Sequence, residues 1–113
     1  MVRRIIWSDR AFEDLTLIYN YIARDSQRYA QLQIKLIQSK LLALVDYPSL
    51  GRLVPELPDS IYREIIIENY RVIYRINDRD SLIIIIAIVH CRQMIENELL
   101  NMEDWNGKGK RKS

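Results

Sequence analysis

The sequence predicts an α+β domain of two layers, in which a hairpin of two helices packs on an antiparallel sheet. Three features indicate this: an N-terminal run of strand formers, two successive stretches with apolar residues at helical spacing, and a late unbroken apolar run. That late run, Leu82–Val89, has eight residues, six of them β-branched. It is too short to cross a bilayer and is typical of a strand that is buried on both faces.

The chain begins with a predicted strand over Val2–Trp7, which an amphipathic helix follows. Ser8 is a candidate N-cap for this helix, and Asp9 puts a carboxylate in the first turn, where the helix dipole favours it. The helix reaches about Arg24, and apolar residues at helical spacing form its inner face. These residues are Phe12, Leu15, Ile18, Tyr19 and Ile22.

A second helix follows Asp25-Ser26, which ends the first helix and offers a second N-cap. It runs to about Tyr47, where Pro48 stops it. Its inner face consists of Ala30, Ile34, Ile37, Leu41, Leu44 and Val45. Because the joint is so short, the two helices form an antiparallel hairpin. The connector 48–59 contains all three prolines of the chain, and a short extended piece is expected at Leu53-Val54.

Three strands complete the predicted sheet as an antiparallel meander. Ile61–Ile67 and Tyr70–Ile76 flank Glu68-Asn69, which forms a tight two-residue turn. The turn 77–81 then leads into the central strand Leu82–Val89. The result is one strand, a helical hairpin and a three-stranded meander, in that order.

The tight turn predicts which side chains share a face of the sheet. It places Glu64 diagonal to Arg71 and Arg75, and we expect a weak surface ion pair between Glu64 and Arg75. Whether Arg71 shares a face with His90 depends on the pairing through the turn 77–81. A slip of one residue reverses the answer, so the sequence leaves it open.

The helical hairpin covers only one face of this sheet, and isoleucines of the central strand remain on the other. A large exposed apolar face requires a cover. Three covers are open: the C-terminal segment, in which Gln93–Trp105 is compatible with a helix, a second copy of the chain, or a partner.

The composition indicates a single domain over residues 1–107 and a basic tail over 108–113 that we expect to be disordered. The tail holds four of the 17 basic residues, so the body keeps 13 basic against 15 acidic residues and a net charge of −2. Such a body is not a general nucleic-acid-binding surface. A single cysteine and the lack of a signal peptide predict a cytoplasmic protein that does not engage a membrane.

The second half of the body uses arginine alone as its basic residue. No lysine occurs between residues 41 and 107, where Arg52, Arg63, Arg71, Arg75, Arg79 and Arg92 lie. Arginine offers paired planar donors that suit carboxylates and phosphates, and it keeps its charge when partly buried. Most of these arginines are expected to pair with nearby glutamates. Arg52, Arg75 and Arg92 are the candidates for binding a target.

His90 is the one histidine, and it stands where the central strand leaves the core. Strand ends are common places for chemistry, and an imidazole suits a general acid or base. A lone histidine in this position is, however, more often a packing and hydrogen-bonding residue. It has no partner at the spacing of metal ligands, so neither a metal site nor a cofactor is indicated. Cys91 is expected to be a small core residue.

The order of these motifs resembles the RelE/ParE superfamily of toxins from bacterial and archaeal type II toxin–antitoxin modules. The resemblance extends from about Ile5 to Arg92. Its motifs are Ile6-Trp7-Ser8-x-x-Ala11, Asp14-Leu15, Tyr21-Ile22, Pro48-x-x-Gly51-Arg52-x-Val54-Pro55-Glu56-Leu57, Arg63-Glu64, Tyr70-Arg71-Val72-Ile73-Tyr74-Arg75 and Val89-His90-x-Arg92. The resemblance implies the two-layer RelE/ParE-like fold. It also implies a cognate antitoxin whose C-terminal segment wraps the hairpin and the sheet in a toxin–antitoxin hetero-oligomer.

The superfamily divides by activity. RelE-like members cut mRNA in the ribosomal A site, and in the YoeB-type branch a glutamate, an arginine and a histidine act as base, phosphate clamp and acid. Glu56, Arg71 and His90 stand at the matching positions, so they are the catalytic candidates if this chain is RelE-like. Two departures stand against that activity. Cys91 replaces the tyrosine that follows the histidine in that branch, and the mid-chain lysines of RelE are absent.

ParE-like members keep the scaffold and poison DNA gyrase instead of cutting RNA. The long helical hairpin, the Gly51-Arg52…Pro55-Glu56-Leu57 connector and the His90-x-Arg92 ending fit this branch better. The resemblance therefore favours a gyrase-directed toxin that needs no catalytic residue. The alternatives are a ribosome-dependent mRNA endoribonuclease, with the ribosome and mRNA as partners, and an inactive relative that only binds its antitoxin.

Overall fold

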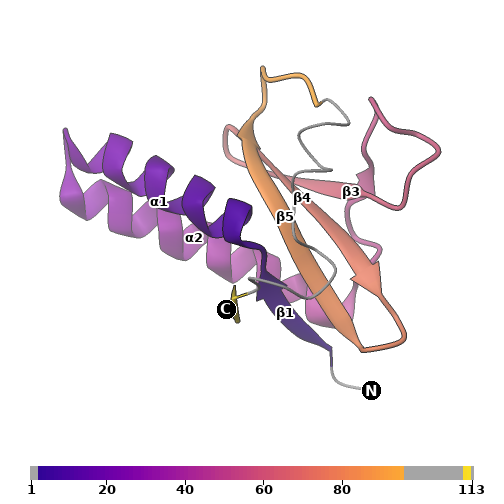
Figure 1. Cartoon of the computed structure of the whole chain (residues 1–113). Coiled ribbons are helices and arrows are strands. Elements are labelled where there is room, and N and C mark those ends of the chain that lie inside the picture. Colours follow the sequence, from indigo (N-terminus) through magenta and orange to yellow (C-terminus); the bar gives the residue numbers. More distant parts are fainter. Residues whose placement is uncertain (1–2, 96–110, 113) are drawn as a thin grey trace.

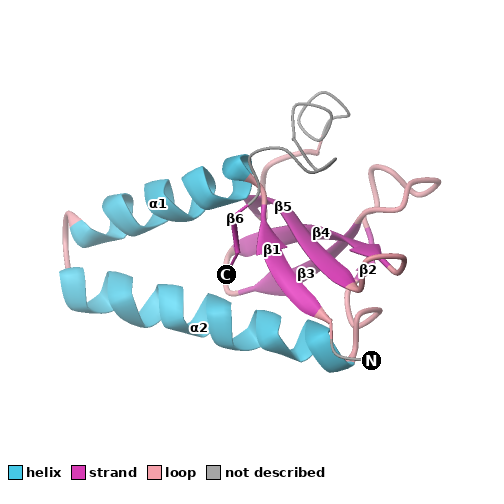
Figure 2. Ribbon diagram, turned by 60° about the horizontal axis from the view of Figure 1, so that its bottom comes forward, coloured by secondary structure: helices cyan, strands magenta, loops and turns pink. Residues whose placement is uncertain are grey.

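The computed structural model describes residues 3–95 and 111–112. Within these residues, six strands form one sheet in the order β2-β3-β4-β5-β1-β6, and a hairpin of two helices packs beside it (Figures 1 and 2). The elements are β1 (Arg4–Trp7), α1 (Asp9–Ala23), α2 (Gln27–Asp46), β2 (Arg52–Leu53), β3 (Arg63–Ile67), β4 (Tyr70–Asn77), β5 (Leu82–His90) and β6 (Arg111–Lys112). The predicted α+β class and its order of elements are confirmed.

Both helices begin at the predicted serine caps. Ser8 Oγ accepts the Ala11 N–H at 3.0 Å, and Ser26 Oγ accepts the Tyr29 N–H at 3.1 Å. Each cap satisfies a backbone donor that has no partner within the helix. α1 and α2 end one residue before the predicted ends and run antiparallel (Figure 2).

The meander forms as predicted, and β1 joins it from the other side. β3 and β4 pair up to Ile67 opposite Tyr70, which confirms the two-residue turn. β1 runs parallel to β5, with Trp7 opposite Ile85. β5 therefore lies between β4 and β1, and all of its residues before His90 are buried. This explains why the run needed no alternation of apolar and polar residues.

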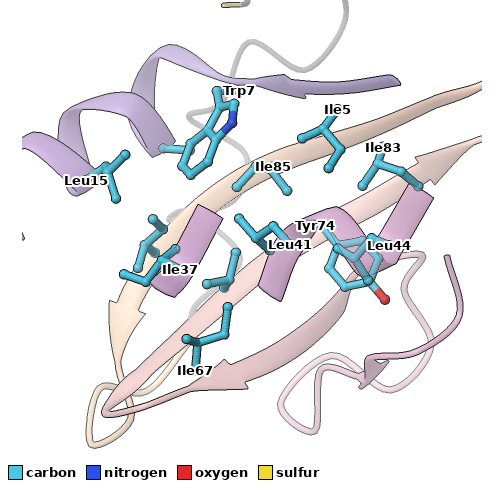
Figure 3. Close-up of a cluster of buried hydrophobic side chains, with 13 residues drawn as sticks. Ile5, Trp7, Leu15, Ile37, Leu41, Leu44, Ile67, Tyr74, Ile83 and Ile85 are labelled. Atoms are coloured by element: carbon cyan, nitrogen blue, oxygen red, sulfur yellow. The ribbon is translucent and has the colours of Figure 1, made fainter. Parts of the chain in front are cut away.

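Buried side chains form one cluster on each face of the sheet. The cluster under the helices contains Ile5, Trp7, Ala11, Leu15, Ile37, Leu41, Leu44, Ile67, Val72, Tyr74, Ile83, Ile85 and Ile88 (Figure 3). The second cluster contains Ile6, Val54, Tyr62, Ile73, Leu82, Ile84, Ile86, Ala87, Val89 and Ile95, with Leu57 packed against it. The chain itself thus covers the isoleucines on the second face of β5, through its connector and the segment after β5.

β5 contains a β-bulge at Ile86. Tyr74 pairs with Ile85 and Ile73 pairs with Ala87, so Ile86 is an extra residue on its strand. As a result, Ile86 and Ala87 both face the second cluster. Every later side chain of β5 then points to the face opposite the one that regular alternation would give it.

Two side chains of the first helix segment hold β5 at this bulge. Ser8 Oγ donates to the Ile86 carbonyl at 2.8 Å, and the Ile88 N–H donates to Asp14 Oδ2 at 3.0 Å. Burial raises the pKa of Asp14, against the opposing effects of the Ile88 and Arg10 hydrogen bonds. β1 ends at Trp7, opposite Ile85, so it does not pair with the C-terminal part of β5. There, the side chains of Ser8 and Asp14 supply the hydrogen bonds that a neighbouring strand would otherwise make.

The structure differs from the predicted boundaries in the connector region. The short extended piece is Arg52–Leu53, one residue earlier than predicted, and β3 starts at Arg63 instead of Ile61. The cause is a turn before β3, in which Ser60 Oγ accepts the Tyr62 N–H at 3.2 Å.

Little of the C-terminal segment is described. Residues 93–95 are not helical, and the remainder of the helix predicted over Gln93–Trp105 lies outside the described residues. Of the 108–113 tail, the structure describes Arg111–Lys112, which pair with Trp7 and Ile6 of β1. No helix in the described part of the chain is long and apolar enough to span a membrane.

Ser8→Ala is expected to destabilise the protein by about 2–3 kcal/mol, because it removes both an N-cap and a hydrogen bond to a buried carbonyl. Ser26→Ala is the matched control, since Ser26 caps α2 at an exposed position and should cost only about 1 kcal/mol. Urea denaturation measures both. Equal losses in the two variants would contradict the second role of Ser8.

Candidate functional site

The connector between α2 and β3 is fastened to the sheet at Gly51. The Gly51 N–H donates to Tyr74 Oη at 2.9 Å, and Tyr74 Oη donates to the Pro48 carbonyl at 2.7 Å. Arg63 Nη1 donates to the Gly51 carbonyl at 2.8 Å. A Cβ at position 51 would collide with the Glu64 carbonyl oxygen, so the close approach requires glycine. These contacts determine where the residues after Gly51 lie.

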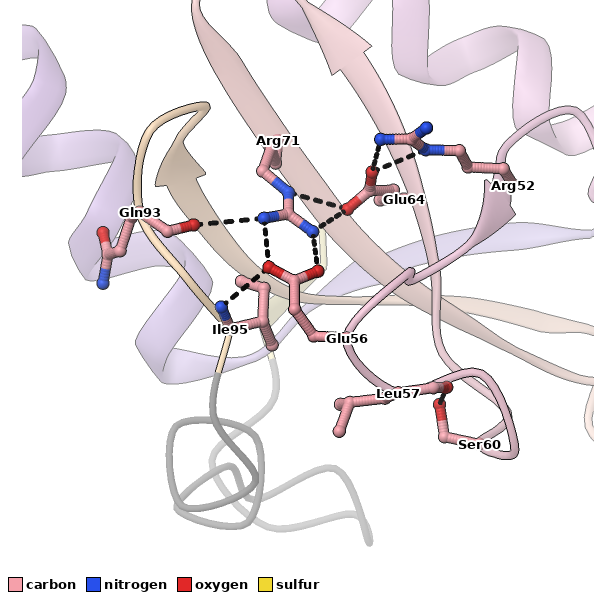
Figure 4. A network of polar contacts seen from close by, with 8 residues as sticks. All are labelled: Arg52, Glu56, Leu57, Ser60, Glu64, Arg71, Gln93 and Ile95. Carbon is pink, nitrogen blue, oxygen red and sulfur yellow. Dashed lines mark hydrogen bonds and ion pairs between the residues drawn. The ribbon is translucent and has the colours of Figure 1, made fainter.

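Arg71 is the centre of a buried polar network (Figure 4), and its side chain is only 7% exposed. Nε donates to Glu64 Oε1 at 2.7 Å, while Nη1 and Nη2 donate to the two carboxylate oxygens of Glu56 at 2.7 and 2.5 Å. Nη1 also donates to the Gln93 carbonyl at 3.1 Å, and Nη2 lies 2.5 Å from Glu64 Oε1. Every nitrogen of the guanidinium is therefore engaged.

Glu64 extends the network to the protein surface. Its carboxylate is fully buried, and Oε2 accepts from Nε and Nη2 of Arg52, both at 2.8 Å. The Arg52 side chain is 65% exposed, so its outer edge faces solvent. The prediction of a weak surface ion pair at Glu64 is wrong, because the connector covers this face of β3 and makes Glu64 an interior residue.

Glu56 joins the connector to the segment that follows β5. In addition to its two bonds from Arg71, Oε2 accepts the Ile95 N–H at 3.0 Å. The hydrogen bonds from Arg71 lower the pKa of Glu56 to about 2, although burial acts in the opposite direction. The same pairing raises the pKa of Arg71. Both groups stay charged across the physiological range of pH.

His90 lies on the opposite face of the sheet from Arg71. Arg71 pairs with Val89 and faces the second cluster, whereas His90 pairs with Tyr70 and faces the helix side. With regular pairing and no bulge at Ile86, His90 would share the face of Arg71. The bulge thus resolves the question that the sequence left open.

The contacts of His90 are those of a packing and hydrogen-bonding residue. Its ring meets the Tyr70 ring edge to face, with 5.9 Å between centroids and an interplanar angle of 79°. Its Nδ1 accepts the Arg92 N–H at 3.1 Å. The neighbouring Cys91 is exposed, so the prediction of a core cysteine is wrong. The strand ends at His90, and the chain leaves the sheet before Cys91 can reach the core.

The structure brings together two of the three catalytic candidates. Glu56 and Arg71 are bonded to each other, and His90 is separated from them by the sheet. Sequence reasoning missed Glu64 as a member of the network. The two-residue turn put Glu64 beside Arg71, but nothing in the sequence indicated that Glu64 would be buried.

The candidate target-binding arginines do not form one cluster. Arg52 borders the network, and Arg92 follows β5 at an exposed position. Arg75 pairs with Ile84, further along β4 from the site. Within residues 3–95 and 111–112, no group of three or more His, Cys, Asp or Glu side chains lies close enough to hold a metal ion.

An open groove of about 660 Å³ lies beside the network. It is lined by Arg52, Pro55, Glu56, Ile66, Arg71, Cys91 and Met94. Of its charged members, Glu56 and Arg71 pair with each other and Arg52 pairs with the buried Glu64, so the groove offers apolar surface next to a neutralised ion network. A phosphate would find no free donor on Arg71, and Glu56 is too weak a base to take a proton efficiently near neutral pH.

A strand, a helical hairpin and a meander around a buried β5 are the fold of RelE/ParE toxins. The family model described as the ParE toxin of the type II toxin–antitoxin system, parDE, matches residues 5–95. The chain belongs to this family.

Solved structures of toxins share this fold. The chromosomal ParDE toxin–antitoxin system from P. aeruginosa aligns with a TM-score of 0.65 and 22% identity, over 79% of this chain and 96% of that chain. A mutant of the E. coli toxin RelE in the free state aligns with a TM-score of 0.60 and 14% identity, over 89% and 93%. The RelBE2 toxin–antitoxin complex from Mycobacterium tuberculosis gives 0.55 and 16%, over 80% and 99%. Among curated proteins, none matches the sequence.

The pairing of Glu56 with Arg71 predicts a specific loss of stability in acid. The pKa of Glu56 is about 2 in the folded protein against an ordinary 4.5, so its contribution is complete above 4.5 and is lost as the pH falls towards 2. Glu56→Gln is expected to be less stable than the wild type at neutral pH, with the two stabilities converging across this window. Denaturation curves at a series of pH values measure the difference. A difference that stays constant with pH would contradict the assignment.

Proposed function

We propose that this chain is the toxin component of a type II toxin–antitoxin module and that it inhibits growth by poisoning DNA gyrase, without cutting RNA. Membership of the ParE family supports the class of protein. The observation that carries the choice of target is the state of Arg71, which is enclosed by Glu56 and Glu64 and has no nitrogen free for a phosphate. The proposed target implies action in the cytoplasm.

Cleavage of RNA by a 2′-hydroxyl requires a base, an acid and a positive charge at the same phosphate. The pKa of Glu56 is about 2, which makes it a poor base near neutral pH. His90 is on the opposite face of the sheet from the other two candidates. These observations speak against the RelE-like endoribonuclease, which remains the alternative to be tested.

The proposed partner in the module is a cognate antitoxin that binds the helical hairpin. Large apolar side chains stand exposed along both helices: Phe12, Leu17, Tyr21, Tyr29, Leu32 and Leu42. A hollow of about 180 Å³ lies between the two helices beside Phe12 and Ile34, and one of about 320 Å³ lies between β1 and α2 beside Trp7 and Leu42. An amphipathic segment that folds on binding would cover such a surface.

Expression of the free chain is expected to arrest growth, and purified chain is expected to trap gyrase on DNA. Incubation with gyrase, ATP and supercoiled plasmid should yield linear DNA after denaturation of the enzyme. His90→Ala should arrest growth as the wild type does, because the exposed imidazole takes part in no chemistry. Growth arrest is scored by colony counts after induction.

The two alternative functions predict different results in these assays. Cleavage of a defined mRNA on purified ribosomes, mapped by primer extension and lost in His90→Ala, would establish the endoribonuclease and overturn the gyrase proposal. A chain that neither traps gyrase nor cuts mRNA, and that lets cells grow, would be an inactive relative that only binds its antitoxin.

Co-expression with the antitoxin tests the hairpin as the neutralising surface. Leu17→Glu is expected to weaken antitoxin binding by about tenfold or more, since it puts a charge on an exposed apolar position of α1. The variant should stay toxic when expressed alone and should need more antitoxin for rescue. Asn20→Glu, a substitution at an exposed polar position of the same helix that does not line the hollow, is the matched control. Rescue of both variants at the same antitoxin dose would contradict this surface.

A further inference from the structure

We infer that the groove beside Arg71 is the surface through which the toxin contacts its target, and that it takes an extended protein segment bearing apolar and acidic side chains. The inference rests on the proposed function in one respect, namely that the chain inhibits growth by acting on another macromolecule. Beyond that function, it assigns the face of the toxin that binds the target, the extended conformation of the bound segment and the apolar and acidic character of its side chains.

The groove presents apolar side chains to solvent. Ile66 of β3 is 46% exposed and Met94 is 68% exposed, and both line the groove. Pro55 and Cys91 complete this part of the lining. Exposed apolar side chains gathered in a concave site mark a binding surface more reliably than scattered ones do. Methionine adapts its shape to a partner, which suits such a surface.

Within the described residues, only the short strand β2 pairs with the edge of the sheet beside this groove. β2 pairs with β3 only at Arg63 and Glu64. Within the described residues, no strand lies along the outer edge of β3 from Ile65 to Ile67, and the side chain of Ile66 lines the groove at that edge. An extended segment can add to such an edge through backbone hydrogen bonds while its alternate side chains enter the groove.

The charge of the groove favours carboxylates on the partner. Glu64 is fully buried, and Glu56 is bonded to Arg71, so the acidic groups of the network are covered. The charge that reaches solvent here is that of Arg52, with Arg92 exposed one residue beyond Cys91. Nε and Nη2 of Arg52 already bond to Glu64, and the exposed part of the guanidinium can donate to a second carboxylate.

A nucleic acid fits this surface less well than a protein does. Binding to a phosphate backbone requires several free cations, and every nitrogen of Arg71 is engaged within the network. The apolar side chains of Ile66 and Met94 offer no partner for phosphates. The network instead makes the groove rigid, because Glu56 and Arg71 tie the connector, β4 and the segment after β5 to one another. Rigid surfaces lose less entropy on binding.

Substitutions on the exposed groove side chains test the inference. Ile66→Glu and Met94→Glu are expected to weaken binding to purified gyrase by about tenfold or more each, as loss of an apolar anchor does, and to restore colony formation after induction. Ile66→Lys should lose less than Ile66→Glu, because a lysine does not repel an acidic segment. Ile61→Glu is the matched control, since Ile61 is 59% exposed and does not line the groove. Urea denaturation verifies that each variant is folded.

The two readouts separate this inference from the proposed target. Groove variants that stay folded but lose growth arrest, beside a toxic Ile61→Glu control, support the groove, whether or not gyrase is the target. Groove variants as toxic as the wild type overturn it, even if gyrase is trapped. If Arg52→Ala and Arg92→Ala lose toxicity while Ile66→Glu remains as toxic as the wild type, the ligand of the groove is a nucleic acid and the inference of a protein segment is wrong. A wild-type chain that arrests no growth overturns both proposals.

Discussion

The buried guanidinium of Arg71 is the interaction on which the second face of the molecule depends. Two carboxylates, Glu56 and Glu64, come from the connector and from β3, and the Gln93 carbonyl comes from the segment after β5. A buried charge is tolerable only when its partners are in place, and removing one partner of such a pair costs about 3–5 kcal/mol. The network therefore makes three separate segments adopt one arrangement, and it leaves an apolar groove beside a set of neutralised charges.

The same network decides what the face can do. A RelE/ParE scaffold with a free arginine, a basic carboxylate and a histidine on one side of the sheet would be equipped for phosphate chemistry. In this chain the arginine is engaged at every nitrogen, the carboxylate has a pKa of about 2, and the histidine packs on Tyr70. Fold alone does not assign an activity, and closely related scaffolds differ in the side chains that they leave available. The available surface here is instead the apolar groove beside this network, for which we propose a protein segment as the ligand.

A single inserted residue in β5 separates His90 from Arg71. Ile86 bulges out of the pairing with β4, and the Ser8 hydroxyl bonds to its carbonyl while Asp14 accepts the next free N–H at Ile88. The start of α1 thus stabilises an irregularity that determines the face on which the end of β5 presents its side chain. The bulge therefore places His90 beside Tyr70 and away from Arg71.

The sequence by itself determined the elements and their order, because capping serines, helical spacing, a two-residue turn and an unbroken apolar run act over a few residues. Ser8, Ser26 and the run Leu82–Val89 have the roles that these local rules predict. Only the tertiary structure decided which face His90 occupies, that Glu64 is buried, and that Cys91 is exposed. Those outcomes depend on a bulge and on contacts between segments distant in the chain, such as the bond between Ser8 and Ile86. No local pattern encodes such contacts, because they exist only once the strands are aligned.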